Sequence, residues 1–316
     1  MNNPDLMEGV VVRSTGRWYT VKAGDGSLVE CALKGRFRIK GIRTTNPVAV
    51  GDHVRFRLIP GKDTGLIETI LPRRNYIIRR ATRLSKAAHI LAANIDQVVI
   101  VATLALPRTS AGFIDRVLVT AEAYHIPGIM IFNKADLFDD ELEKQYMIYR
   151  EVYGDAGYKV LKVSALKGIN LEEVRSLWTG RRSLLVGHSG AGKSALINAV
   201  QPGLGLKTGP ISDTHLKGKH TTTFAQLYDL DFGGEIIDTP GVKEFGLTDF
   251  DRNEVGERYP EMRSLLPQCR FNNCTHVHEP GCAVQKAVEE GSIALFRYNN
   301  YLSILSDDYW AEQTVN

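Results

Sequence analysis

The chain has 316 residues, of which 43% are hydrophobic, so it is long enough for two or three domains. No 18 apolar residues run together, and the first residues lack a basic region followed by a long apolar stretch. These features argue against a membrane-spanning or secreted protein, and we expect a soluble, cytoplasmic one. Residues 1–80 hold 15 Lys and Arg against 7 Asp and Glu, whereas residues 81–316 hold 24 against 29. The basic N-terminal module favours a polyanionic partner, although a solvated basic surface would show the same charge.

Five short runs between residues 9 and 71 alternate with turns and are typical of β-strands: GVVVRS, WYTVKA, GSLVECAL, VAVGDHVRFRLI and GLIETIL. Five strands in about 60 residues predict a small barrel, and the VGDHV turn resembles those of OB-fold proteins. We therefore assign residues 1–72 to an all-β OB-fold domain. Its aromatic side chains could also belong to the core, which we favour for Phe37 and Phe56. The side chains that could form a face for RNA are Arg13, Arg17, Trp18, Tyr19, Arg36, Phe37 and Arg38.

The middle of the chain alternates between apolar runs and helical patterns. The apolar runs, typical of buried strands, are 97–105, 127–133, 159–164, 183–187, 224–230 and 234–238. Helical patterns separate several of them, at 110–124, at 137–153 and after Gly192. This alternation predicts an α/β fold with a mainly parallel sheet that helices cover on both faces. We interpret the basic stretch from Arg73 to about Ala92 as a linker. The predicted domain spans residues 73–245, and a small, helical third unit spans 246–316.

A phosphate-binding motif lies inside this second domain. GHSGAGKS at 187–194 fits G-x-x-x-x-G-K-[ST] and stands between a predicted strand and a predicted helix, which argues against a chance glycine-rich turn. In such a P-loop, successive backbone N–H groups point at phosphates and the helix N-terminus adds positive potential. Lys193 would reach the β and γ phosphates, and Ser194 would ligate Mg²⁺.

Two further motifs follow predicted strands: NKAD at 133–136 and DTPG at 238–241. The Asp136 carboxylate can accept hydrogen bonds from the N1–H and amino groups of guanine, and adenine lacks this donor pair. Asn133 would meet the base edge and tether neighbouring loops, while Asp238 can hold Mg²⁺ through water. The residues assigned to the nucleotide are Asn133, Lys134, Ala135, Asp136, Ser164, Ala165, Gly187, His188, Ser189, Gly190, Ala191, Gly192, Lys193, Ser194, Ala195, Asp238 and Gly241.

The order of these motifs differs from that of an ordinary GTPase, in which the P-loop comes first. Here NKAD and Ser164-Ala165 precede the P-loop, and DTPG comes last. Joining the usual ends through a link near residues 178–182 would keep every strand in place, because termini generally lie close together at a domain surface. The sequence therefore predicts a circularly permuted P-loop GTPase domain. Because the segment after DTPG leads into the third unit, the nucleotide state could reposition that unit.

The third unit contains a cluster of possible metal ligands. Cys269, Cys274 and Cys282 fall within 14 residues, which in an intracellular chain suggests metal more than disulfides. Together with His276 or His278 they make a Cys₃His set, the composition of a closed structural zinc site. Zinc there would stabilise a unit with little core and take no part in catalysis. The fourth cysteine, Cys31, stands alone, and we expect it to be buried.

These motifs resemble those of the RsgA family, also called YjeQ or YloQ, which are circularly permuted GTPases that depend on the small ribosomal subunit. The resemblance covers essentially the whole chain and includes KTGPISDTHLKGKHTTT at 207–223, similar to the switch segment of the family except that Lys219 replaces the usual Arg. It implies an OB fold, a permuted G domain and a zinc domain in one chain that acts late in small-subunit assembly. It also implies that His276, not His278, completes the zinc site.

The resemblance extends to the chemistry of hydrolysis. One of residues 221–223 would bind Mg²⁺ in the GTP state, and we favour Thr222. Val242 follows DTPG where many GTPases carry a water-orienting Gln, so hydrolysis should be slow until another group positions the water. The resemblance suggests His220 for that role, and the alternative is a solvated histidine of the switch loop. The residues assigned to catalysis are His220, Lys193 and Thr222.

We therefore expect an enzyme that hydrolyses GTP to GDP and phosphate, is stimulated by the small (30S) ribosomal subunit and binds its rRNA. The expected cofactors are one structural Zn²⁺ per chain and Mg²⁺ with GTP, and the expected protein is a monomer without a membrane partner. The alternative is a nucleotide-gated RNA-binding module whose hydrolysis is incidental. Strong stimulation of turnover by the subunit would favour the enzyme over the module.

Overall fold

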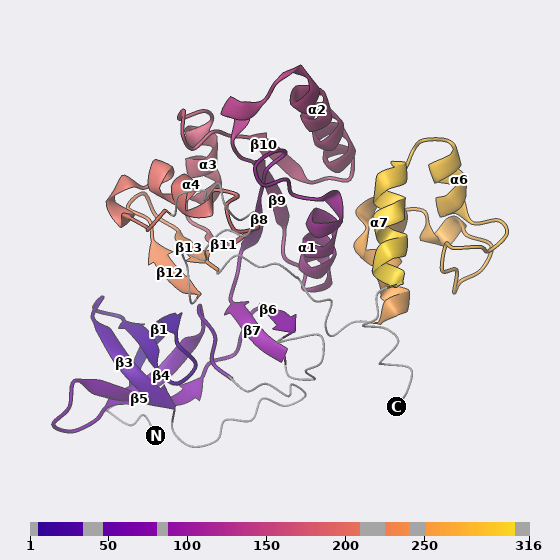
Figure 1. The fold of residues 1–316 in the computed structure, drawn as a ribbon. Helices are drawn as coiled ribbons and strands as arrows, with labels where there is room; N and C mark the ends of the chain where they lie inside the picture. Colours follow the sequence, from indigo (N-terminus) through magenta and orange to yellow (C-terminus); the bar gives the residue numbers. More distant parts are fainter. Residues whose placement is uncertain (1–5, 34–46, 81–87, 209–224, 240–250, 307–316) are drawn as a thin grey trace.

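The N-terminal strands form a closed barrel in the computed structural model, which describes residues 6–33, 47–80, 88–208, 225–239 and 251–306 (Figure 1). The strands pair in the order β1-β2-β3-β5-β4, and β1 also pairs with β4, which closes the barrel as an OB fold requires. The predicted OB fold is therefore confirmed. The strands are β1 (Met7–Ser14), β2 (Tyr19–Ala23), β3 (Leu28–Leu33), β4 (His53–Leu58) and β5 (Thr64–Ile70).

The barrel core separates the aromatic residues that could face RNA from those that cannot. Phe56 is fully buried, as predicted, and so is Cys31. Tyr19 is only 1% exposed and packs in the same core, so its proposed place on an RNA-binding face is wrong. Trp18 remains 40% exposed. Residues 36–38, which include Phe37, lie outside the described residues.

The second domain is built on a sheet whose strands pair in the order β10-β9-β8-β11-β13-β12. All of these pairings are parallel except that of the edge strand β12 with β13. Every residue of the central strand β8 is buried, as expected for a strand covered on both faces. The predicted α/β fold is confirmed. The strands are β8 (Gln97–Ala102), β9 (Gly128–Phe132), β10 (Lys159–Lys162), β11 (Arg182–Val186), β12 (Gln226–Asp229) and β13 (Glu235–Asp238).

Helices cover the two faces of this sheet and form separate cores with alternate residues of its strands. Val98 and Ile100 pack with α1 (Ala111–Ala123) and α2 (Asp140–Asp155). Val99 and Val101 pack on the other face with α3 (Leu171–Trp178) and α4 (Lys193–Val200). The alternation has period two, as expected for side chains of a strand that point to opposite faces. Two short 3₁₀ helices, η1 (Ala135–Leu137) and η2 (Pro202–Leu204), follow β9 and α4.

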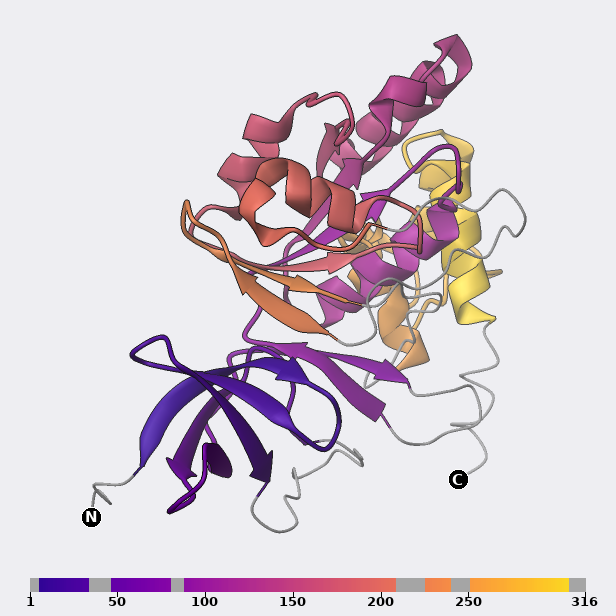
Figure 2. The same ribbon diagram turned by 60° about the vertical axis from the view of Figure 1, so that its left-hand side comes forward.

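The segment predicted as a linker is a β-hairpin, so that prediction was wrong. Its strands β6 (Tyr76–Arg80) and β7 (Ala88–Ala93) pair with each other in antiparallel register. Figure 2 shows the hairpin between the barrel and the main sheet. Ile77 and Ala92 are completely buried in the core of the second domain. The five arginines of residues 73–92 suggest a solvated linker, but the apolar residues of the stretch decide its structure.

The barrel and the second domain share one continuous sheet, because Arg13 of β1 pairs with Gln226 of β12. Lys22 of β2 also forms an ion pair with Asp229 of β12. This pairing fixes the barrel against β12. In the sequence, β12 lies between the predicted switch segment (207–223) and DTPG (238–241).

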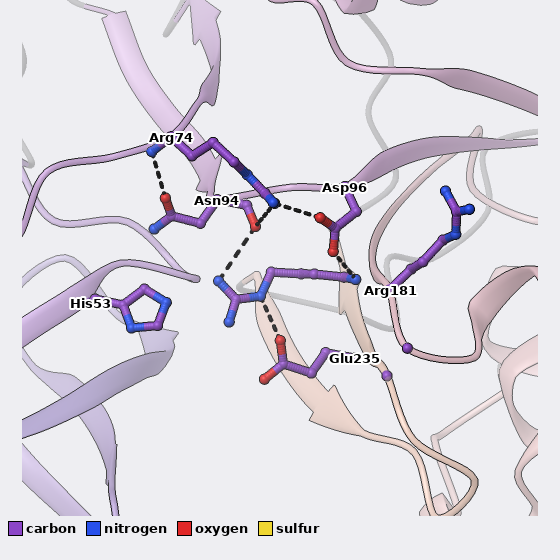
Figure 3. A pocket seen from close by; sticks show the side chains of 9 residues that line it. His53, Arg74, Asn94, Asp96, Arg181 and Glu235 are labelled. Carbon is purple, nitrogen blue, oxygen red and sulfur yellow. Dashed lines mark hydrogen bonds and ion pairs between the residues drawn. The ribbon is translucent and has the colours of Figure 1, made fainter.

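A polar cavity of about 480 Å³ lies where the barrel meets the starts of β8, β11 and β13 (Figure 3). Arg182 is only 8% exposed, and its guanidinium donates hydrogen bonds to the Gly51 carbonyl at 2.9 Å and to Glu235 at 2.6 Å. Arg74 contacts one oxygen of Asp96 at 2.5 Å, and the other oxygen accepts from the Arg182 backbone N–H at 2.7 Å. Arg182 therefore joins the second domain to the barrel, and Arg74 is already engaged with Asp96 within the second domain.

The C-terminal unit contains short helices around a small core of its own. That core also takes in Val119 and Ala123 of α1, so the unit is packed on the second domain (Figure 1). Among the helices that the structure describes, none is long and apolar enough to cross a membrane. The elements are η3 (Arg252–Arg258), α5 (Pro260–Arg263), η4 (Leu266–Gln268), α6 (Ala283–Glu289) and α7 (Leu295–Leu305).

Candidate nucleotide site and metal centre

The predicted nucleotide residues gather at one edge of the parallel sheet, although the motifs are up to about 100 residues apart in the sequence. Asn133 follows β9, Ser164 follows β10 by one residue, Gly187 follows β11 and Asp238 ends β13. These are the carboxyl ends of parallel strands, the edge at which open α/β sheets bind ligands. The topology therefore brings the motifs together despite their permuted order.

The P-loop encloses its own lysine. Gly190 and Gly192 have φ of 84° and 90°, a region that favours glycine, and Gly192 caps the N-terminus of α4. The Lys193 ammonium donates to the carbonyls of Gly187 at 2.8 Å and His188 at 3.3 Å. Burial lowers the pKa of Lys193, and the Asp238 carboxylate opposes this shift. An anion in the loop would favour the charged ammonium for the same reason that Asp238 does.

Asn133 connects three parts of the site. Its side-chain amide donates to the Ala191 carbonyl of the P-loop at 3.0 Å, and its oxygen accepts from the Ala165 backbone N–H at 3.1 Å. The side chain is 2% exposed, so these hydrogen bonds are made out of solvent. The prediction that Asn133 tethers neighbouring loops is confirmed. Asp136, in turn, contacts the Ser164 hydroxyl, which also accepts from the Lys167 backbone N–H at 3.1 Å.

A loop that the sequence analysis did not single out also contributes to this edge. It follows β8, and its Leu106 carbonyl accepts a hydrogen bond from the ammonium of Lys134. Pro107 of the same loop packs on Gly190, where an added Cβ would lie 3.3 Å from the proline ring. Thr109 braces the loop by accepting from the Thr103 backbone N–H at 3.0 Å. The signal available in the sequence was its position at the carboxyl end of a buried strand.

Three predicted site residues, His220, Thr222 and Gly241, lie outside the described residues. Asp238 is described and is 1% exposed at the end of β13. Its neighbour Thr239 is completely buried and donates from its hydroxyl to the Leu185 carbonyl at 2.9 Å, which fixes the end of β13 beside the P-loop strand. The oxygen ligands available for Mg²⁺ among the described residues are thus the Ser194 hydroxyl and the Asp238 carboxylate.

The four predicted zinc ligands converge in the C-terminal unit. The ligand atoms of Cys269, Cys274, His276 and Cys282 all lie within 4.8 Å of one another. His276 Nδ1 is 3.4 Å from the Cys282 sulfur and 3.7 Å from that of Cys269. Three thiols and one imidazole nitrogen are soft and borderline donors that suit a tetrahedral Zn²⁺, so the residues present fit this metal.

The surroundings of the cluster hold these ligands in place. His276 is 4% exposed and adopts a φ of 58°, whereas His278 is exposed and does not belong to the cluster. Burial raises the pKa of the Cys274 thiol to about 12 and also raises that of Cys282. The carboxylate of Glu279 accepts from three backbone N–H groups of the loop, at 2.8, 3.0 and 3.2 Å. These hydrogen bonds tie the backbone around His276 to Glu279 in the conformation that places the imidazole among the three cysteines.

Comparisons with known proteins agree with this geometry. The protein-family model described as RsgA GTPase matches residues 70–248 of the chain. The family model described as RsgA N-terminal domain matches residues 8–67. The chain is 50% identical over 312 residues to the small ribosomal subunit biogenesis GTPase RsgA of Christiangramia forsetii, covering 97% of this chain and 99% of that one. It is 49% identical over 304 residues to the protein of the same name from Flavobacterium johnsoniae, covering 96% and 94%.

Solved structures give the same result for the fold. The crystal structure of YjeQ from Thermotoga maritima matches with a TM-score of 0.74 at 34% identity, covering 98% of this chain and 99% of that one. The structure of YloQ, described as a circularly permuted GTPase, matches with a TM-score of 0.71 at 27% identity and covers 99% and 97%. The circular permutation deduced from the motif order is thereby confirmed, and the chain belongs to the RsgA GTPase family.

Proposed function

We propose that this chain hydrolyses GTP to GDP and phosphate as a step in the biogenesis of the small ribosomal subunit. The observation that carries the proposal is the bonding of Asn133 to both the P-loop and the Ser164-Ala165 segment, which unites a base-reading motif and a phosphate-binding loop in one site. The names of the similar proteins, small ribosomal subunit biogenesis GTPase, supply the process in which the site would act.

The site residues divide the nucleotide between them. Asp136 would accept hydrogen bonds from the N1–H and amino groups of guanine, with the Lys134 stem across the base plane. Backbone N–H groups of residues 189–194 and the Lys193 ammonium would surround the phosphates. Mg²⁺, when bound, neutralises charge on the β and γ phosphates, and Ser194, Asp238 and Thr222 are the side chains that would hold it. Gly241 would meet the γ phosphate through its N–H.

Hydrolysis also needs a water molecule in line with the γ phosphate, and Val242 cannot orient one. We assign that role to His220, whose imidazole can accept a hydrogen bond from water when neutral. On its own the chain should then turn over slowly, with the small subunit supplying the arrangement of the switch segment. A His220→Ala protein that still hydrolysed GTP at the normal rate with small subunits present would remove His220 from the mechanism.

The barrel would supply affinity for rRNA. Arg13 and Arg17 are exposed, and so is Trp18 at 40%, and such side chains can hold a phosphate backbone and stack a base. We place the protein in the cytoplasm as a monomer, with one Zn²⁺ in its C-terminal unit. A Cys274→Ala protein that retained one zinc per chain, measured by elemental analysis, would overturn the zinc assignment.

The test of the main proposal is phosphate release from GTP and from ATP, with small subunits, large subunits or neither. We expect the protein to hydrolyse GTP but not ATP. Hydrolysis should be slow in the free protein and much faster with small subunits. If the rate of phosphate release does not respond to subunits and RNA binding depends on the nucleotide, the protein acts as the nucleotide-gated RNA-binding module and not as the subunit-stimulated enzyme.

Recognition of guanine is tested separately by Asp136→Asn. Because an amide cannot accept both hydrogen bonds from guanine, we expect GDP to bind roughly 10- to 100-fold more weakly, as for loss of a hydrogen bond to a charged group. Asp140→Asn, an exposed acidic residue four positions away in α2, is the matched control and should bind GDP normally. Equal affinities in the two variants would remove Asp136 from the base site.

A further inference from the structure

Helix α1 touches the P-loop at one end. The ring of Phe113 lies 4.1 Å, centroid to centroid, from the imidazole of His188, the second residue of the loop. The Ser110 hydroxyl caps the helix by accepting from the Phe113 backbone N–H at 3.2 Å, which fixes the first turn. Phe113 is 8% exposed, so a displacement of α1 would change the packing of His188 and hence of the loop.

Half a turn along the same helix, a buried charge network joins α1 to α7. Asp115 is completely buried and accepts from the Tyr153 hydroxyl at 2.7 Å, from the Asn300 amide at 2.5 Å and from the Arg297 guanidinium. Arg297, only 1% exposed, also binds both carboxylate oxygens of Glu261, at 2.7 and 3.1 Å. A network satisfied in this way has few alternative arrangements, so it fixes α7 relative to α1.

The next residues of α7 hold the metal loop. The Tyr298 hydroxyl donates to the His276 carbonyl at 2.6 Å, and the Tyr301 hydroxyl donates to the Thr275 carbonyl at 2.7 Å. Tyr301 also belongs to the apolar core that contains Val119 of α1 and Cys282, one of the proposed ligands. Contacts among described residues therefore run without interruption from the metal ligands through α7 and α1 to the P-loop.

We propose that α1 links the two sites, so that a metal ion in the Cys₃His cluster strengthens nucleotide binding at the P-loop, with Phe113 and Asp115 as positioning residues. The metal would order the loop that carries residues 275 and 276, and α7 and α1 would transmit that order to His188. Nucleotide binding to the metal-free protein must then order more of the chain, and the entropy lost in this ordering weakens the binding. Linkage requires the reverse effect to be equal, so nucleotide must strengthen metal binding by the same factor.

The inference rests on the proposed nucleotide function but can fail on its own. The first experiment titrates a fluorescent GDP analogue into zinc-loaded protein and into the same protein after removal of zinc by a chelator. We expect binding to the metal-free protein to be weaker by a factor in the range of about 5 to 150 that is common for coupled sites. The second experiment keeps the protein intact and measures the transfer of zinc to a competing chelator with and without saturating GDP. The apparent zinc affinity should rise with GDP by the same factor.

Two variants test the path. Phe113→Leu keeps an apolar side chain but removes the ring from His188, and Asp115→Asn removes the charge that Arg297 binds; both should bring the coupling factor towards 1. The control is Arg263→Ala. Arg263 of the C-terminal unit is an exposed side chain that forms an ion pair, at 3.1 Å, with Glu122 of the same helix α1. Exposed pairs contribute little, so the control should keep the full factor. If Asp115→Asn fails to fold, Phe113→Leu still decides the outcome.

The outcomes separate the two proposals. GDP affinities within about twofold for the two forms of the protein, with no effect of GDP on zinc transfer, would overturn the linkage and leave the GTPase proposal intact. An undiminished factor in Phe113→Leu would show that the coupling does not pass through α1 and would overturn the path as well. Failure of the zinc-loaded protein to bind any GDP would instead overturn the proposed function.

Discussion

Replacing Arg297 by Met removes the cation at the centre of the buried network, and the structure indicates how much stability is lost. Burial by itself would lower the pKa of Arg297, but Asp115 and Glu261 raise it well above the usual value, so the guanidinium is charged. Its loss leaves the Asp115 carboxylate completely buried without a cation, while Glu261 can still reach water. Breaking one buried pair in this way costs about 3–5 kcal/mol.

The loss should depend on pH in a definite direction. Burial raises the pKa of Asp115, and Arg297 opposes that rise, so the pKa climbs further in the variant. A carboxyl group whose pKa is raised in the folded state stabilises it at low pH and less so as the pH rises. The defect of Arg297→Met should therefore be larger at pH 8 than at pH 5. Urea unfolding of the zinc-loaded protein measures the total, and hydrogen exchange in α1 and α7 measures the local effect.

The double variant Asp115→Asn with Arg297→Met is the matched control for this reasoning. It removes the buried charge together with its partner, so it should be more stable than Arg297→Met alone and its stability should respond less to pH. A loss below about 1 kcal/mol in Arg297→Met, or an equal loss in the double variant, would show that the buried carboxylate is not what makes the arginine necessary.

Three further variants test other parts of the molecule. Gly192→Ala should weaken GDP binding at least about 10-fold in a titration, because φ of 90° is unfavourable for alanine and the added Cβ would lie 2.4 Å from the Asn133 amide. A normal affinity for GDP would show that the P-loop tolerates the added Cβ. Arg182→Met should destabilise the barrel junction by about 2–4 kcal/mol through its lost charged hydrogen bonds, whereas exposed Arg181→Met should not; equal urea midpoints would refute this. Burial, with Glu30, raises the pKa of Cys31 to about 12. The free energy of unfolding should therefore fall from about pH 9 to 12, where only the unfolded thiol ionises. A Cys31→Ala protein whose free energy of unfolding fell equally steeply over this range would contradict the prediction.

The sequence predicted the parts of the fold that depend on local periodicity and on motifs with fixed structural contexts. Each of the six apolar runs of the second domain became a strand, and the motifs fell at strand ends as their chemistry requires. The hairpin of β6 and β7 could not be predicted in the same way, because the five arginines of residues 73–92 give the stretch the basic composition of a linker, although its apolar residues anchor it. Composition over a window hides a face made of two or three side chains.

The site could be predicted only as far as its motifs reach. Asn133 and Lys193 were named because their roles follow from residue type and spacing. The loop of Leu106 and Pro107 carries no motif, and its contact with Lys134 arises from three-dimensional proximity alone. Asp115 is a similar case, since a single acidic residue in an apolar helix pattern gives no sign of a partner 182 residues away. Tyr19 shows the reverse error, in which a plausible surface residue proved to be core.

The pairing of β1 with β12 has a consequence for synthesis of the chain. The barrel leaves the translating ribosome first, but the strand that extends its sheet is made about 200 residues later, with β12. Until then the end of β1 around Arg13, which lies beyond its pairing with β4, lacks this partner, and unpaired strand ends are prone to pair with other chains. Because β13, which ends in Asp238, is also among the last strands to emerge, the barrel would gain its neighbour at the same stage at which the phosphate site is completed. The permuted order of the motifs thus makes the continuous sheet between the two domains wait for the end of the second domain.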